Sequence, residues 1–291
     1  MKVLVIGRSG MLGSALLRYF TSIGVDAHGT QRIFSDEPLF LCAHHDRVSA
    51  DGLKNLLRDF DLVVNCIASK FFPPTESEIF RESLFVNSQF PHIAAKACAE
   101  SGCFFIQISS DAVFSGTAGP YSERDAVEMT DFYSMSKILG EVRCRGSLNI
   151  RCSIIGHEKR AQHHLLEWFL SQRAGQHVQG YTDYIWNGVT CLQLGQFIGR
   201  LLCEGLLAKL VSETSVIHFA PNEPLSKYEL LFCLNEVYEK RLIVEPVASG
   251  KKVARVLSSV FGSYYSREND FRKVLREQRY FESNYGKESS I

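Results

Sequence analysis

Tyr133 and Lys137 form the segment YSMSK, and their types and spacing suggest chemistry more directly than any other pair in the chain. Residues four positions apart on a helix project from the same face, so these two titratable groups would lie close together. A nearby ammonium favours the phenolate and lowers the pKa of a tyrosine from its usual value of about 10. The pair therefore suits proton transfer. Ordinary surface residues also show this spacing, so the interpretation depends on other motifs.

Ser109, Ser110 and Asp111 close an apolar strand shortly before the tyrosine. A serine hydroxyl at a strand end can donate a hydrogen bond to a substrate carbonyl oxygen. We expect Ser110 to do so, with Ser109 or Asp111 sharing the role if the register differs by one residue. Simple capping of the strand end is the competing interpretation.

A glycine-rich turn opens the chain, with Gly7, Gly10 and Gly13 spaced as GxxGxxG. It follows a short aliphatic run typical of a buried strand and begins a helical pattern, which is the context of a dinucleotide-binding turn. The cofactor pyrophosphate would lie at the helix N-terminus. The residues expected to hold the cofactor in this segment are Gly7, Ser9, Gly10, Met11, Leu12 and Gly13.

The end of the second predicted strand indicates which cofactor is used. NAD-binding proteins commonly place an acidic residue there, whereas this chain has Thr30, Gln31 and Arg32, with Arg8 inside the glycine turn. An arginine favours a 2′-phosphate, so NADP(H) is the expected cofactor and NAD(H) the alternative. A solvated loop arginine is the competing interpretation of Arg32.

Composition limits the possible functions. The chain has 291 residues, 45% of them hydrophobic, and a formal net charge of zero, which fits a large core and gives no basic surface for nucleic acid or membranes. The nine cysteines include no CxxC pair, and no apolar run is long enough to span a bilayer, so we expect a cytoplasmic protein. The histidines show no metal-ligand spacing, and no metal site is expected.

Strands and helices alternate through the first half of the chain. Helices are expected at 11–22, at about 85–101 and around Tyr133, and strands at 2–7, 26–32, 61–68, 103–109 and 147–155, with a weaker candidate at 40–45. This alternation predicts an α/β fold in which a doubly wound parallel sheet forms an NAD(P)-binding Rossmann domain.

The pattern changes after residue 155. We expect residues 1–155 to form the Rossmann domain and residues 156–291 to form mainly a smaller, discontinuous α/β substrate lobe, with segments within 176–220 completing the sheet. Ser226 and Glu229 are spaced as the capping box of a helix over 224–240, and 215–219 suits a returning strand. From about Lys251 basic and aromatic residues follow without clear periodicity.

Five segments together resemble the extended short-chain dehydrogenase/reductases: GRSGMLG, VVNCIA, FVNSQFPHIAAKACAESG, FIQISSDAVFSG and YSMSKILGE. Within that group the chain is most similar to the dTDP-4-dehydrorhamnose reductase family, whose members reduce a 4-keto group on a nucleotide-linked deoxysugar. The resemblance is close over about the first 155 residues and looser beyond them.

The resemblance implies a role for each motif residue. Tyr133 would give a proton to the carbonyl oxygen, Lys137 would hold the nicotinamide ribose, and Ser110 would bind the carbonyl. Asn65 and Ala68 would lie along the cofactor. Asn87 would match a family asparagine near the substrate, and Trp186 and Asn187 would line the sugar pocket. Structural roles are the alternative for Asn65, Asn87 and Trp186. Ala112 stands where rhamnose reductases usually have a tyrosine, which favours a different sugar.

The expected function is NADPH-dependent reduction of such a sugar for a surface polysaccharide or glycan, by a monomer or homodimer whose partner is the nucleotide-sugar substrate. Two alternatives remain. One is an NADP-binding regulatory subunit without turnover, similar to the accessory subunit of methionine adenosyltransferase, and the other is a nucleotide-sugar epimerase or dehydratase. The sequence leaves open the sugar, the nucleotide and the product stereochemistry.

Overall fold

The computed structural model describes residues 1–30, 50–70, 77–158 and 164–285. The chain divides into two compact units, each built from several segments. The first comprises Met1–Phe114, Ala126–Arg151 and Gly195–Ile217, and the second comprises Ser115–Asp125, Cys152–Leu194 and His218–Ile291. The units are therefore interleaved along the sequence.

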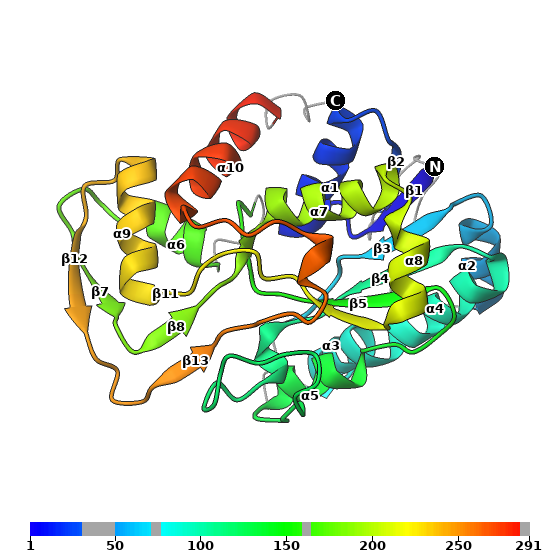
Figure 1. Ribbon diagram of the computed structural model, residues 1–291, viewed down its shortest axis with the longest axis horizontal. Coiled ribbons are helices and arrows are strands. Elements are labelled where there is room, and N and C mark those ends of the chain that lie inside the picture. Colours follow the sequence, from blue (N-terminus) through cyan, green and yellow to red (C-terminus); the bar gives the residue numbers. More distant parts are fainter. Residues whose placement is uncertain (31–49, 71–76, 159–163, 286–291) are drawn as a thin grey trace. The chain divides into compact units, whose positions relative to one another are not determined.

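A six-stranded sheet forms the centre of the first unit (Figure 1), with the order β10-β5-β4-β3-β1-β2. The pairings from β2 through β5 are all parallel, as the alternation of strands and helices predicts. The chain moves from β1 outward to β2 and then returns to the other side of β1, so β1 and β3 flank the topological switch point. The strands are β1 (Lys2–Ile6), β2 (Asp26–Gly29), β3 (Leu62–Asn65), β4 (Phe104–Ile108), β5 (Ser147–Arg151) and β10 (Val216–His218).

Helices cover both faces of this sheet, and Figure 1 shows α1 and α7 on one side and α3, α4 and α5 on the other. Both faces are covered, which is why the middle of β1 is a continuous apolar run with almost no exposed surface. The helices are α1 (Met11–Ser22), α2 (Ala50–Leu57), α3 (Ser77–Leu84), the π-helix η1 (Phe85–Gln89), α4 (Phe90–Ser101), the 3₁₀ turn η2 (Asp111–Val113), α5 (Phe132–Leu139), α7 (Cys191–Cys203) and α8 (Leu206–Glu213).

The described part of the second unit consists of short strands and three helices packed around a separate apolar core that contains Trp186, Leu230 and Phe271. Its strands form a three-stranded sheet in the order β11-β8-β13 and two pairs, β12 with β7 and β6 with β9. The elements are β6 (Ile154–Ile155), α6 (Leu165–Ser171), β7 (His177–Tyr181), β8 (Tyr184–Trp186), β9 (Val189–Thr190), β11 (Leu225–Ser226), α9 (Lys227–Tyr238), β12 (Ile243–Val247), β13 (Val253–Arg255), the 3₁₀ turn η3 (Gly262–Tyr264) and α10 (Phe271–Tyr285).

Three expectations about elements need correction. The strand predicted over 147–155 is two strands, because β5 ends at Arg151 and β6 pairs with β9 in the second unit. The helix expected at about 85–101 begins with a π-helical turn and directly continues α3. The last stretch is not aperiodic, since α10 buries Phe271, Val274, Leu275, Gln278 and Phe281 at helical spacing. The weaker strand candidate at 40–45 lies outside the described residues.

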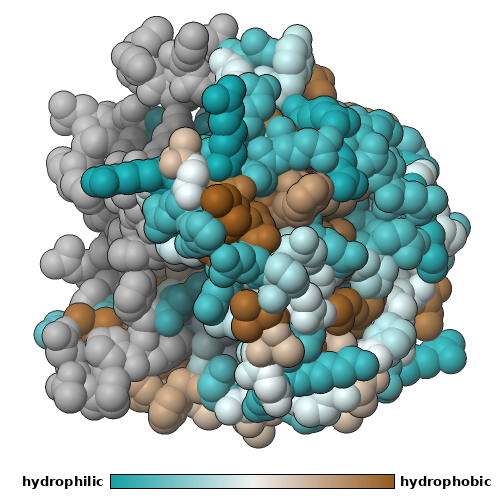
Figure 2. Space-filling model, turned by 90° about the vertical axis from the view of Figure 1, so that its left-hand side faces the viewer, coloured by the Kyte–Doolittle hydropathy of each residue, from teal (hydrophilic) through white to brown (hydrophobic). Residues whose placement is uncertain are grey.

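The surface of the described chain is mostly polar. Figure 2 shows, on one face, several separate apolar patches among hydrophilic side chains. Among the helices in the described ranges, none combines the length and the apolar character needed to cross a bilayer. The eight cysteines in the described part are all free thiols.

Candidate active site

The glycine turn joins β1 to α1 at the switch point of the sheet. Gly7 has a φ of +93°, which only glycine adopts readily, and its N–H donates to Thr30 Oγ1 at 3.1 Å. Gly10 N–H donates back to the Gly7 carbonyl at 3.1 Å. A Cβ on Gly13 would collide with that same carbonyl. Helix α1 therefore begins so close to the end of β1 that only a residue without a Cβ fits at Gly13.

The start of α1 suits a phosphate. Gly10 is the N-cap and has no side chain with which to cap the helix, so the first backbone N–H groups are available to an anion. Ser9 and Met11 are half-buried beside it, while Leu12 is buried and anchors the turn to the core. These residues fit the pyrophosphate of a dinucleotide, as the sequence predicts.

Arg8 lies against the end of β2, where the adenosine ribose of a dinucleotide lies in this fold. Its N–H donates to the Thr30 carbonyl at 3.2 Å, and a Cβ added to Gly29 would approach Arg8 Cβ to 2.5 Å. Arg32, the other expected contact, falls outside the described residues.

Helix α5 carries the tyrosine and lysine pair. Asp131 caps it, accepting a hydrogen bond from Ser134 N–H at 2.7 Å in a capping box. Lys137 is only 3% exposed, and its Nζ donates to the Ile108 carbonyl at 2.7 Å. Tyr133 lies one turn earlier and is half-buried, with Lys70 Nζ 5.8 Å from its ring centroid. The ammonium of Lys137 is thus held at the carboxyl end of β4.

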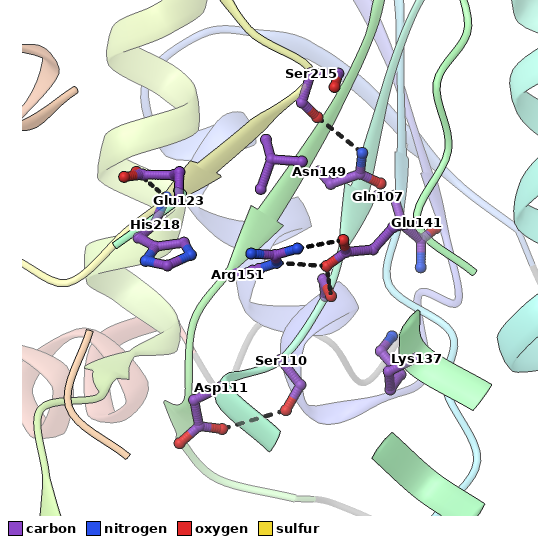
Figure 3. Close-up of polar contacts among 12 residues, drawn as sticks. Gln107, Ser110, Asp111, Glu123, Lys137, Glu141, Asn149, Arg151, Ser215 and His218 are labelled. Carbon is purple, nitrogen blue, oxygen red and sulfur yellow. Dashed lines mark hydrogen bonds and ion pairs between the residues drawn. The ribbon is translucent and has the colours of Figure 1, made fainter. Parts of the chain in front are cut away.

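Ser109 and Ser110 follow β4 directly, and their hydroxyl groups have different partners. Figure 3 shows the contact of Ser110 with Asp111. Ser109 Oγ donates to Glu141 Oε1 at 2.7 Å. Ser110 Oγ accepts from Ala112 N–H at 3.1 Å and donates to Asp111 Oδ1 at 3.2 Å, a long contact for two oxygens. A hydroxyl has one proton, and Ser109 already donates its proton to a carboxylate. Ser110 is therefore the better placed of the two to bind a carbonyl oxygen.

Glu141 and Arg151 form a buried ion pair that the sequence reasoning did not single out. Arg151 Nε and Nη2 each approach a different oxygen of the carboxylate at 2.7 Å, and the two side chains are 7% and 12% exposed. Arg151 also lies over the ring of Phe114, 5.4 Å from its centroid. The glutamate ends the family segment YSMSKILGE, which was the available signal, but sequence alone did not show its partner.

Asn65 and Asn87 make hydrogen bonds within the chain. Asn65 Nδ2 donates to Gln107 Oε1 at 2.8 Å and links β3 to β4. Asn87 lies in the π-helix, where its Oδ1 accepts from the Ser69 backbone N–H and its Nδ2 donates to the Ser69 carbonyl. Its Nδ2 also donates to Ser136 Oγ at 3.0 Å. Ala68 is exposed after β3. Contacts of these three residues with a ligand stay predictions.

Trp186 and Asn187 belong to the second unit. Trp186 is 6% exposed and packs edge-on against Phe271. The Asn187 amide donates to the Leu257 carbonyl at 2.8 Å and accepts from Leu257 N–H at 2.9 Å. Trp186 thus packs in the core, and Asn187 links two segments of the second unit by hydrogen bonds. A role of either residue in binding sugar stays a prediction. Within the ranges that the structure describes, no three His, Cys, Asp or Glu side chains are grouped to hold a metal ion.

The family model described as "RmlD substrate binding domain" matches residues 1–257. The chain belongs to this family. The RmlD match spans all the strands of both units and ends before α10. Membership confirms the resemblance seen in the sequence motifs.

Curated relatives of this RmlD-family chain include proteins of two different names. The methionine adenosyltransferase 2 subunit beta of Danio rerio is 26% identical over 251 residues, which cover 81% of this chain and 74% of that protein. The rat protein of the same name is 31% identical over 142 residues, covering 48% of this chain and 41% of its own length. A dTDP-4-dehydrorhamnose reductase of Salmonella typhimurium is 28% identical over 148 residues, covering 48% and 46%.

Solved structures confirm the fold. A dTDP-4-dehydrorhamnose reductase from Clostridium acetobutylicum superposes with a TM-score of 0.75 at 18% identity, covering 97% of this chain and all of that one. A Bacillus anthracis enzyme of the same name, solved in complex with NADP, gives a TM-score of 0.74 at 17% identity over 96% and 99%. The Rossmann-type α/β fold is thus established. Together with the RmlD match, it assigns the chain to the NAD(P)H-dependent oxidoreductases of the short-chain dehydrogenase/reductase type.

Proposed function

We propose that this protein reduces a 4-keto group on a nucleotide-linked deoxysugar with NADPH, supplying an activated sugar for a surface polysaccharide or glycan. One observation carries the proposal. Lys137, one turn after Tyr133, donates to the carbonyl of Ile108, only two residues before Ser110. The acid, the cation and the carbonyl-binding hydroxyl required for ketone reduction therefore belong to two neighbouring segments of the first unit.

The first unit fits a dinucleotide at this same edge of the sheet. The parallel strands β1, β3 and β4 all end there, so the glycine turn and the end of β4 share one edge. Gly7, Gly10 and Gly13 would hold the pyrophosphate, and Lys137 would bind the nicotinamide ribose. When bound, the cofactor would supply the hydride.

Tyr133 would donate its proton to the carbonyl oxygen, since an alkoxide left unprotonated in a site that excludes water is costly. Ser110 would donate a hydrogen bond to the same oxygen after giving up its long contact with Asp111. Lys137 would favour the phenolate that Tyr133 becomes after the transfer. Each role requires a side chain that this chain has.

Arg8 supports NADPH over NADH. Its backbone N–H donates to the Thr30 carbonyl after β2, and its Cβ and Cδ lie near Gly29, so its guanidinium would lie near the adenosine ribose. A guanidinium can bind a phosphate through two parallel hydrogen bonds. Arg32 is the second residue that we propose for this contact.

The test is the substitution Tyr133→Phe, which removes the proton donor and keeps the ring. We expect NADPH oxidation that depends on a nucleotide-linked 4-keto sugar to fall about 10²- to 10⁴-fold, with NADPH binding unchanged. Tyr280→Phe is the matched control, because Tyr280 is 71% exposed on α10. Full activity of Tyr133→Phe would contradict the assignment of the acid.

A regulatory subunit is the second candidate, because relatives named methionine adenosyltransferase 2 subunit beta match over most of this chain. Retention of Ser110, Tyr133 and Lys137 favours the enzyme, since binding alone needs no proton donor. Purified protein should be assayed against dTDP- and UDP-linked 4-keto sugars. Absence of turnover, with a methionine adenosyltransferase catalytic subunit bound in a stable complex, would favour regulation. Product formation without net NADPH consumption would instead indicate an epimerase or dehydratase.

A further inference from the structure

Glu141 connects three chain segments at one end of the first unit. It follows α5 by two residues, Arg151 is the last residue of β5, and Ser109 is the first residue after β4. One carboxylate receives hydrogen bonds from both of the other segments, each at 2.7 Å (Figure 3). The ends of β4, β5 and α5 therefore meet at a single charged group.

The burial of this pair argues against a role in stability alone. Removing two charges from water costs several kcal/mol per ion, and apolar residues of similar volume often stabilise a fold equally well or better. What a bidentate guanidinium–carboxylate pair provides is a fixed geometry. The Ser109 hydroxyl is a further donor to one of the same oxygens, so the pair also holds the segment between β4 and η2.

The same segment carries the proposed catalytic serine. Lys137 holds the Ile108 carbonyl, and Glu141, four residues later, holds the Ser109 hydroxyl. Two consecutive residues of the β4 end are thus fixed by α5 and the turn that follows it. Ser110 comes next, and its distance from the tyrosine on α5 depends on both contacts.

We propose that Glu141 is a positioning residue: through Ser109 and Arg151 it holds the Ser110 hydroxyl in register with Tyr133 and Lys137. The inference rests on the proposed reductase function. It does not make Glu141 a proton donor, because its carboxylate is already engaged by a guanidinium and a hydroxyl. Misplacement of a reacting group by about 1 Å can cost about 10²-fold in rate.

The test compares the wild type with the double variant Glu141→Leu/Arg151→Met, which replaces the ion pair by apolar side chains of similar size. We expect the melting temperature, NADPH affinity and substrate KM to change little, while kcat falls about 10- to 100-fold. The pH dependence of the remaining kcat should be that of the wild type, since no acid or base is removed. The double variant Glu236→Leu/Arg272→Met is the control, because that pair is half-exposed at 2.6 Å in the second unit.

The single variant Glu141→Gln provides a second measurement. Its amide oxygen can still accept the Ser109 proton, but Arg151 loses its counter-charge, so we expect a lower melting temperature and a kcat above that of the double variant. An unchanged kcat in the folded double variant would overturn the proposal. A fall in kcat that is matched by equal losses of NADPH affinity and thermal stability would also overturn it, because it would indicate a general folding defect.

Hydrogen–deuterium exchange separates this inference from the proposed function. If the wild type turns over no nucleotide-linked 4-keto sugar, the reductase proposal fails, while exchange can still be measured. Faster exchange of the amides at 109–112 in the double variant, with β1 and α1 unchanged, would support the positioning role. Unchanged exchange at 109–112 would overturn it.

Discussion

Ser109 and Ser110 are adjacent and chemically identical, yet their hydroxyl groups have different hydrogen-bond partners. Ser109 donates to a carboxylate that is also bound by arginine, whereas Ser110 accepts from Ala112 N–H and donates in a long contact to the neighbouring Asp111 side chain. A hydroxyl whose proton is already used by a strong acceptor is a poor donor to a substrate. The chemistry of the strand end therefore depends on the acceptors around each serine.

This difference predicts unequal effects of removing each hydroxyl. Ser110→Ala should lower kcat about 10²-fold, the usual cost of losing one donor to a developing oxyanion. Ser109→Ala should lower kcat by about tenfold, less than Ser110→Ala, because it removes one contact that positions Ser110 while the Glu141–Arg151 pair and the Lys137 contact with Ile108 remain. Steady-state rates with NADPH and the accepted sugar measure both. Equal losses, or a larger loss for Ser109→Ala, would reverse the assignment.

The sequence indicates the residue types of the candidate active site but not the contacts that these residues make. The YSMSK spacing was sufficient to place Tyr133 and Lys137 on one helix, and the glycine spacing was sufficient to locate the turn. It favoured Ser110 and left Ser109 and Asp111 as alternatives, because a one-residue shift at a strand end cannot be read from hydrophobicity. Glu141 and Arg151 were missed since nothing in their separation along the chain shows that they meet in space.

At the scale of elements, α5 is held against the π-helix by backbone and side-chain contacts. Asn87 Nδ2 donates to Ser136 Oγ, and Ser88 Oγ donates to the Ser136 carbonyl at 3.0 Å. A Cβ at Gly140 would overlap the carbonyl oxygen of Asn87. The close approach of α5 to η1 therefore requires glycine at its C-terminal end.

Gly140→Ala should consequently push α5 away from η1. Gly140 has a φ of −89°, so alanine is acceptable to the backbone and the cost comes from overpacking, about 1–3 kcal/mol. We expect a lower melting temperature together with a lower kcat. Gly262→Ala is the matched control, because nothing lies within 4 Å of the added Cβ. Normal stability and activity of Gly140→Ala would show that the contact is easily relieved.

A turn in the second unit predicts a dependence of stability on pH. Asp183 accepts hydrogen bonds from Ser249 N–H at 3.0 Å, Ser249 Oγ at 3.0 Å and Gly250 N–H at 3.2 Å. These bonds, first of all that from Ser249 N–H, lower the pKa of the Asp183 carboxyl below its usual value of 3.8. Because the pKa is lower in the folded state, the stabilisation is complete above the unfolded pKa and is lost as the pH falls through the folded one.

Asp183→Asn should therefore lower the melting temperature at pH 7 and make no difference in strongly acidic solution. Thermal unfolding of the variant and the wild type from pH 7 to pH 2 measures this convergence. Asp59→Asn is the control, since Asp59 is exposed and pairs only at 4.0 Å with Arg58. A constant difference at every pH would mean that the charge of Asp183 has no part in the turn.

Elements with strong local signals were predicted well. Helix α1 runs over the predicted residues 11–22, and α9 begins with the predicted capping box of Ser226 and Glu229. Helix α10 was missed because many charged residues surround its five buried positions and obscure the period. The break between β5 and β6 was missed because no glycine or proline interrupts residues 147–155, and only the different partners of the two strands separate them.

For the whole molecule, ligand binding should raise stability through the first unit, which contains the glycine turn. A ligand present at about 100 times its dissociation constant adds about 2.7 kcal/mol to the free energy of unfolding. We expect NADPH to raise the melting temperature more than NADH at equal concentration, because Arg8 can bind the extra phosphate. Arg8→Ala should remove most of this difference, and Arg200→Ala, an exposed arginine on α7, should not. Equal shifts with the two cofactors in the wild type would contradict the preference for NADPH.

The chain passes between the two units five times, at 114–115, 125–126, 151–152, 194–195 and 217–218. A fragment that ends near residue 155 would therefore lack residues 195–217 of the first unit, which include most of α7 and of β10. The same interleaving limits any attempt to exchange the substrate preference of two relatives by grafting the second unit of one onto the other. A chimera would have to replace 115–125, 152–194 and everything from 218 onward together, because no single pair of junctions encloses the second unit.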